Sequence, residues 1–114
     1  MNVYNYQSNG GSDKIMNYIN HLPSSEKAAG HTIIQDLANN DAGILNLLNT
    51  RHLYKKIYEI KFGDHRLMYV LNDSDEIYLL HACKKQKNKA AMVDLKKAKA
   101  RAKELSKLLG KRFV

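Results

Sequence analysis

The chain has 114 residues and a net charge of +8, with 44% hydrophobic and 26% charged residues. This length is enough for a single domain over residues 1–114, and the composition is globular rather than disordered. No apolar run approaches the roughly 18 residues that a membrane span requires. Because the N-terminus lacks the pattern of a signal peptide and Cys83 is the single cysteine, we expect a cytoplasmic protein that has no disulfide and does not enter a membrane.

The positive charge is concentrated in the second half of the chain. Residues 1–50 have a formal charge of −2, whereas residues 51–114, with seventeen basic and seven acidic side chains, have a charge of +10. This asymmetry indicates a polyanionic partner, which could be nucleic acid, an acidic protein or a membrane surface. A solvated basic helix would give the same count, so charge alone does not choose between these alternatives.

The first half predicts a short strand followed by two helices. Residues 3–6 have the aromatic and β-branched content of a strand. Ser12 or Asp13 caps the first helix, Pro23 ends it, and Ser24 or Ser25 caps the second. The expected apolar faces are Ile15, Met16, Ile19 and Leu22 on the first helix, and Ala29, Ile33, Ile34, Leu37 and Ala38 on the second. The segment with Leu45, Leu47 and Leu48 is not assigned to an element.

The second half predicts an antiparallel β-meander followed by a helix. Alternating side chains indicate three strands over residues 57–62, 66–71 and 76–82, which are separated by turn-forming residues. A further helix follows and stops at Gly110. Its apolar stripe is sized to dock on the sheet and consists of Leu95, Ala98, Ala102, Leu105 and Leu109. The predicted class is α+β, with helices packed on one face of the sheet.

The chain shows no familiar metal-binding or nucleotide-binding motif. The five histidines fall on different predicted elements without helical pairing, and Cys83 has no second cysteine nearby. There is also no phosphate-binding glycine loop and no glycine-flanked serine. We therefore expect neither a metal nor a cofactor.

Basic residues gather at one end of the predicted meander. Lys61 and Arg66 flank the first hairpin turn, and the third strand ends toward the same turn. A lysine-rich run follows that strand, and its members are Lys84, Lys85, Lys87 and Lys89. These cations should form a compact positive site, although a solvated loop beside a rim arginine is an equally open interpretation.

Three segments of the meander carry a family pattern, and they are Ile57-Tyr58-Glu59-Ile60-Lys61, Arg66-Leu67-Met68-Tyr69 and Leu79-Leu80-His81-Ala82-Cys83-Lys84-Lys85. Together they resemble the RelE/ParE toxin superfamily, and most closely its phage-derived HigB-like branch, and the similarity covers residues 13–109. The chain departs from the pattern of this branch at three places. Lys61 stands where an arginine is usual, Ala82-Cys83 where Gly-Phe is common, and Lys87-Asn88-Lys89 where Thr-Gln-Lys is common. These departures concern the site more than the fold.

The resemblance implies a RelE-like fold and a toxin of a type II toxin–antitoxin system. Such a toxin would be a metal-independent mRNA interferase, an endoribonuclease that cuts mRNA on the ribosome, and its partner would be an antitoxin, often a helix-turn-helix protein. The implied catalytic residues are Arg66, Lys84, Lys85 and His81, and the implied RNA-binding residues are Lys61, Lys87, Lys89 and Lys56. His81 could equally be structural, and Glu59 is expected to form a structural ion pair. The alternatives are a ParE-like poison of DNA gyrase and a noncatalytic nucleic-acid-binding module.

Overall fold

The computed structural model describes residues 1–85 and 90–114, so Lys87 and Lys89 lie outside the described residues. The described part of the chain is an α+β domain with a five-stranded mixed sheet, and it is compatible with a RelE-like fold. The elements follow one another in the order β1 (Asn2–Asn5), α1 (Lys14–Asn20), α2 (Ser24–Asn39), the 3₁₀ helix η1 (Ala42–Asn46), β2 (Thr50–Tyr54), β3 (Ile57–Phe62), β4 (His65–Asn72), β5 (Glu76–Lys84) and α3 (Ala90–Leu109). None of the helices in these residues is long and apolar enough to span a membrane.

The predicted meander is present, and the sheet contains one strand that the sequence did not indicate. The strand order is β1-β5-β4-β3-β2, in which β1 runs parallel to β5 and the other neighbours are antiparallel. Strand β2 adds an outer edge beside β3. Strand β5 continues two residues beyond the predicted end, to Lys84.

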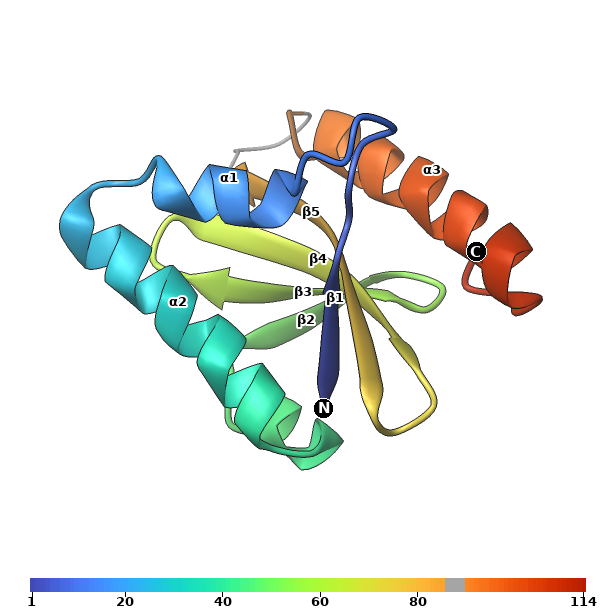
Figure 1. Ribbon diagram of the computed structural model, residues 1–114, viewed down its shortest axis with the longest axis horizontal. Coiled ribbons are helices and arrows are strands. Elements are labelled where there is room, and N and C mark those ends of the chain that lie inside the picture. The colour runs from blue at the N-terminus through green and yellow to red at the C-terminus, as the bar shows by residue number, and fades with distance from the viewer. Residues whose placement is uncertain (86–89) are drawn as a thin grey trace.

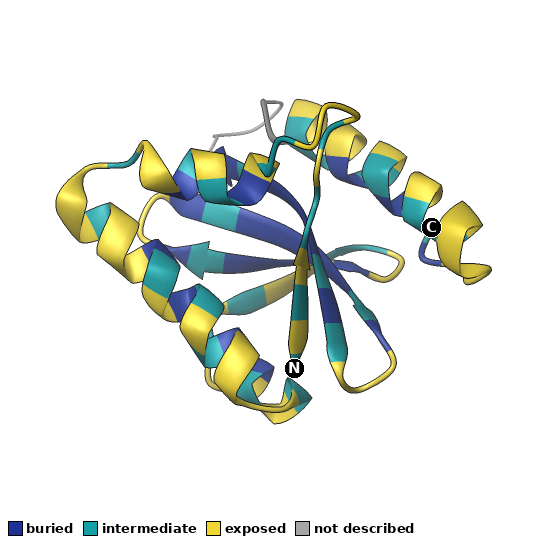
Figure 2. Ribbon diagram, viewed as in Figure 1, coloured by how far each residue is buried: buried dark blue, intermediate teal, exposed yellow. Residues whose placement is uncertain are grey.

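Helices cover both faces of the sheet, so the prediction of helices on one face is wrong (Figure 1). Helices α1 and α2 pack against one face, where Leu67 and Tyr69 are buried, and α3 packs against the other, where Met68 and Val70 are buried. The physical reason is the continuous apolar run along β4, because a strand that is buried on both faces cannot alternate between apolar and polar side chains. The central strands are accordingly buried while the outer helix surfaces are exposed (Figure 2).

The helices follow most of the predicted faces. Ile15, Ile19, Ile33 and Leu37 are buried beneath α1 and α2, whereas Ala29 and Ala38, which were predicted on the apolar face of α2, are exposed. On α3, Ala98 and Ala102 are fully buried, and their small side chains let the helix lie close to the sheet. Leu95 and Leu105 are partly buried against the same cluster.

The caps agree with the prediction at one helix and differ at the next. Asp13 caps α1, because its Oδ1 accepts hydrogen bonds from the backbone N–H groups of Ile15 and Met16 at 3.1 and 2.9 Å. Helix α2 has Pro23 at the N-cap position, and no side chain caps it. Ser24 already belongs to the helix, so the prediction that Ser24 or Ser25 caps α2 is wrong. Gly110 has a positive φ of 65° and follows the last residue of α3, as predicted.

Candidate active site

A pocket of about 180 Å³ opens on the α3 face of the sheet, beside the turn between β3 and β4. The register places Lys61 opposite Arg66, and Arg66 opposite Cys83. The backbone N–H of Lys85 donates to the carbonyl of Asp64, which fixes the end of β5 against the same turn. Among the described residues, the pocket is lined by Arg51, Glu59, Lys61, Arg66, Met68, Cys83, Lys84, Lys85 and Asp94.

The lining carries a surplus of positive charge. Four of its cations were expected here from the sequence, and the structure confirms that Lys61, Arg66, Lys84 and Lys85 meet at one end of the sheet. The fifth is Arg51 of β2. Two carboxylates, those of Glu59 and Asp94, lie among these five cations, so a polyanion is attracted to the pocket and two proton acceptors are within it.

Arg66 is held in place by the turn beside it. Its Nη1 donates to the carbonyl oxygens of Gly63 at 3.1 Å and of His65 at 2.8 Å. Its Nε lies 3.9 Å from Oε2 of Glu59, and the side chain is 15% exposed. These contacts fix the guanidinium plane at the pocket, which suits it to bind a phosphate that enters from solvent.

Glu59 is a buried carboxylate between two arginines. Its side chain is 3% exposed, and Oε2 lies 2.9 Å from Nη2 of Arg51 in addition to the longer contact with Arg66. Oε2 has no hydrogen-bond partner among the described residues, so its attraction to the two arginines is mainly between charges. Glu59 therefore forms the structural ion pair that the sequence indicated.

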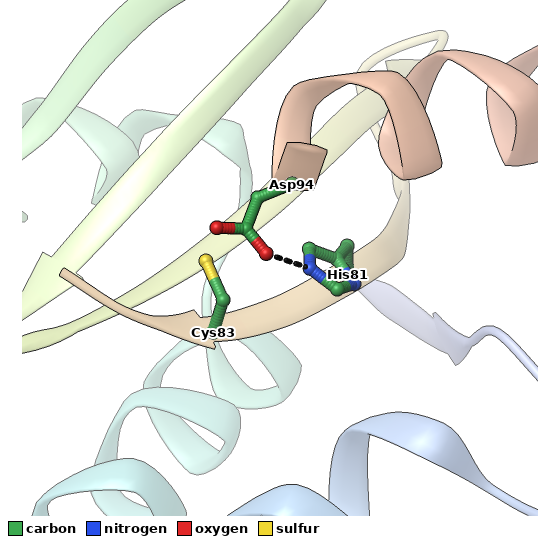
Figure 3. Close-up of side chains that lie close together, drawn as sticks. All are labelled: His81, Cys83 and Asp94. Carbon is green, nitrogen blue, oxygen red and sulfur yellow. Dashed lines mark hydrogen bonds and ion pairs between the residues drawn. The ribbon is translucent and has the colours of Figure 1, made fainter. Parts of the chain in front are cut away.

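Helix α3 meets β5 through a polar cluster of His81, Cys83 and Asp94 (Figure 3). Nε2 of His81 lies 2.8 Å from Oδ1 of Asp94. Burial lowers the pKa of His81, and the hydrogen bond to Asp94 offsets only part of that effect. Burial, together with the nearby charge of Asp94, raises the pKa of the Cys83 thiol to about 12, so this sulfur remains protonated.

The side-chain types of this cluster are those of a zinc site, but their surroundings do not fit one. Nη1 of Arg101 lies 3.2 Å from Nδ1 of His81. A metal on Nε2 requires Nδ1 to donate a hydrogen bond, whereas an arginine can only donate to it. The pocket cations Arg66, Lys84 and Lys85 also oppose the entry of a divalent ion. We therefore interpret the cluster as a group of polar contacts that holds α3 against β5.

The remaining predicted residues lie apart from the pocket lining. His81 is buried and reaches the pocket through Asp94. Lys56 precedes β3 at the opposite end of that strand from Lys61, and its backbone N–H contacts the carbonyl of Phe113 near the C-terminus. The structure thus does not bring Lys56 together with the other cations. Lys87 and Lys89 lie outside the described residues.

Two pocket residues, Arg51 and Asp94, were not identified from the sequence. Arg51 lies on β2, whose Thr, Leu and Tyr residues favour a strand, and the following Lys55-Lys56 pair forms its turn to β3. Reading this segment as a hairpin partner of β3 would have placed Arg51 beside Glu59. Asp94 precedes Leu95 of the apolar stripe, and only the contact between α3 and β5 reveals its neighbours.

Comparisons with known proteins place residues 17–103 within one family. This segment is most of the chain, and it matches the sequence-family model of the phage-derived Gp49-like proteins. No curated protein matches the sequence.

Proposed function

The chain belongs to the phage-derived Gp49-like family, and we propose that it is the toxin of a type II toxin–antitoxin system. Family membership is consistent with such a toxin and suggests an antitoxin partner. We further propose that the partner is a helix-turn-helix antitoxin and that the toxin acts in the cytoplasm. The +10 charge of residues 51–114 is suited to both an acidic antitoxin segment and RNA.

The proposed activity is metal-independent cleavage of mRNA on the ribosome. Such cleavage removes a proton from a ribose 2′-OH, stabilises an anionic phosphorane and gives a proton to the leaving 5′-oxygen. The observation that carries the proposal is the gathering of five cations and two carboxylates in one pocket around Arg66. A pocket with this lining has groups for all three tasks.

Four of the five pocket cations have a proposed task. Arg66, fixed by Gly63 and His65, clamps the scissile phosphate, because its orientation is set before RNA arrives. Lys84 and Lys85 are exposed, contact phosphate and supply the proton to the leaving oxygen. Lys61 binds the RNA backbone, and Lys87 and Lys89 are assigned the same task from the sequence. Lys56 would contact RNA only outside the pocket.

Primer extension on cellular mRNA after induced expression tests this function. We expect new 5′ ends within ribosome-engaged codons, which disappear in an Arg66→Ala variant. Arg112→Ala is the matched control, because Arg112 is an exposed arginine on the C-terminal segment, away from the pocket. Both variants are checked for folding by their thermal unfolding.

Other outcomes assign the chain to the alternative functions. Intact mRNA together with cleavage complexes of DNA gyrase would overturn the interferase and indicate a gyrase poison. Nucleic-acid binding with neither effect would indicate a noncatalytic module. Cleavage that persists in Arg66→Ala would overturn the role of Arg66 but not the ribonuclease activity.

A further inference from the structure

Asp94 presents a carboxylate to the pocket from a different element than the cations. It lies near the start of α3 and lines the pocket, and its side chain is 16% exposed. Figure 3 shows one carboxylate oxygen joined to His81, while the other points away from the histidine. The second oxygen is therefore not used by the His81 contact.

His81 is oriented so that it can only donate to Asp94. Nη1 of Arg101 donates to the carbonyl of Leu80 at 2.7 Å and lies 3.2 Å from Nδ1 of His81. Since an arginine cannot accept a hydrogen bond, Nδ1 is the acceptor and Nε2 carries the proton that is donated to Asp94. Burial keeps the ring neutral by lowering its pKa. The contact with His81 consequently holds the carboxylate of Asp94 in one orientation.

Glu59, the other carboxylate in the pocket, is less suited to accept a proton from RNA. It is the more buried of the two, with a side chain 3% exposed, and it is the direct counterion of Arg51 and Arg66. Protonating Glu59 would leave these two guanidinium groups without their shared anion. The partners found for Asp94 are instead a neutral imidazole and a protonated thiol, Cys83, so proton uptake by Asp94 breaks no ion pair with a cation among the described residues.

We propose that Asp94 is the general base of the cleavage reaction and that His81 and Arg101 are its positioning residues; this inference rests on the proposed ribonuclease function. The carboxylate oxygen of Asp94 that does not contact His81 takes the 2′-OH proton as the 2′-oxygen forms its bond to phosphorus. The bond from phosphorus to the 5′-oxygen breaks, and the 5′-oxygen takes a proton from Lys84 or Lys85. The products are a 2′,3′-cyclic phosphate and a 5′-hydroxyl.

Replacing Asp94 by asparagine tests the base directly. The amide oxygen of Asp94→Asn still accepts from His81, but the side chain no longer accepts a proton. We expect the cleavage rate to fall by about 10²–10⁴-fold, the typical contribution of general acid–base catalysis. Affinity for an uncleavable oligonucleotide with 2′-deoxyribose at the scissile position should stay within about twofold. Glu104→Gln, at an exposed acidic residue further along α3, is the matched control and should cleave at the wild-type rate.

A sulfur-substituted substrate separates the base from the acid. A substrate with a bridging 5′-sulfur has a thiolate leaving group, which needs no proton because thiols ionise near pH 8.5. We expect this substrate to restore a variant that lacks the general acid, tested by the double variant Lys84→Ala/Lys85→Ala, but not Asp94→Asn. Restoration of Asp94→Asn by this substrate would overturn the assignment of Asp94 as the base.

His81 is tested by the interaction of two substitutions. His81→Gln should lower kcat with an unchanged KM, and it should cause no further loss in the Asp94→Asn background, because a positioning residue acts only through the group that it orients. Additive losses would show that His81 acts independently of Asp94 and would overturn its role as a positioning residue. If the wild-type protein cuts no RNA, the proposed function fails; if the wild type cuts RNA and Asp94→Asn cuts equally well, only the present inference fails.

Discussion

Arg51 and Glu59 face each other across β2 and β3, and Nη2 of the arginine lies 2.9 Å from Oε2 of the glutamate. The pair is strongly asymmetric in its exposure, since the arginine side chain is 58% exposed and the glutamate side chain only 3%. Arg51 can therefore be hydrated when it is alone, whereas Glu59 cannot. The two residues should therefore contribute unequally to the free energy of unfolding. Removing Arg51 leaves a buried carboxylate, whereas removing Glu59 leaves an arginine that water can reach.

We predict that Arg51→Ala is more destabilising than Glu59→Gln. Among the described residues, removing Arg51 leaves the buried carboxylate with Arg66 at 3.9 Å as its remaining ion-pair partner. The change should cost about 2 kcal/mol in the free energy of unfolding. Glu59→Gln removes the buried charge and should cost less. Urea unfolding of both single variants and of the double variant measures the coupling. Equal costs for the two single variants would contradict this description of the pair.

The stability of the domain should fall on acidification because of His81. Burial holds the pKa of His81 in the folded state below its ordinary value of 6.5. The unfolded chain therefore binds a proton more readily, so this contribution to stability is fully present above about pH 6.5 and is lost as the pH falls below that value. Urea unfolding at pH 7.5 and pH 5.5 should show the decrease. His81→Gln should reduce it, whereas the exposed-site control His21→Gln should not; an unchanged decrease in His81→Gln would contradict the prediction.

Gly30 should not tolerate a methyl group, although it lies inside a helix, where alanine is normally preferred. A Cβ at this position would lie 2.9 Å from Cγ2 of Ile19 and 3.4 Å from Cε2 of Phe62, where α1, α2 and β3 meet. We expect Gly30→Ala to destabilise the fold by about 1–3 kcal/mol through overpacking. Gly10→Ala is the control, because a Cβ there meets nothing within 4 Å. A rise in melting temperature for Gly30→Ala would show that helix propensity outweighs the contact.

The meeting of Lys61 with Arg66 was predictable from the sequence because it depends only on local rules. Gly63-Asp64 marks a tight turn, and antiparallel pairing across a turn fixes which residues lie opposite each other. The turn between β4 and β5 fixes the register of β5 in the same way, so the end of β5 lies beside Arg66. Short-range turn chemistry therefore determined four of the five cations in the pocket.

The positions of Arg51 and Asp94 in the pocket depend on long-range packing, which the sequence pattern alone does not determine. Arg51 lies on a short edge strand with little buried surface, so its apolar signal is weak. Asp94 reaches the pocket only because α3 crosses the second face of the sheet, and the prediction of one covered face excluded that arrangement. The run Leu67-Met68-Tyr69-Val70, apolar at every position, was the signal for two covered faces.

Cleavage of RNA should be unaffected by metal removal. His81, Cys83 and Asp94 place one nitrogen, one sulfur and one oxygen within 4.8 Å of one another, a set of donors that zinc accepts. Arg101, however, directs a donor at Nδ1 of His81, and five cations surround the adjoining pocket. We therefore expect dialysis against EDTA, or added Zn²⁺ at equimolar concentration, to leave the cleavage rate and the melting temperature unchanged. The Cys83→Ala variant should be equally insensitive to EDTA and to Zn²⁺. Activity that is lost in EDTA and restored by Zn²⁺, and absent from Cys83→Ala, would instead identify this cluster as a metal centre, because only a metal would require the thiolate that burial of Cys83 suppresses.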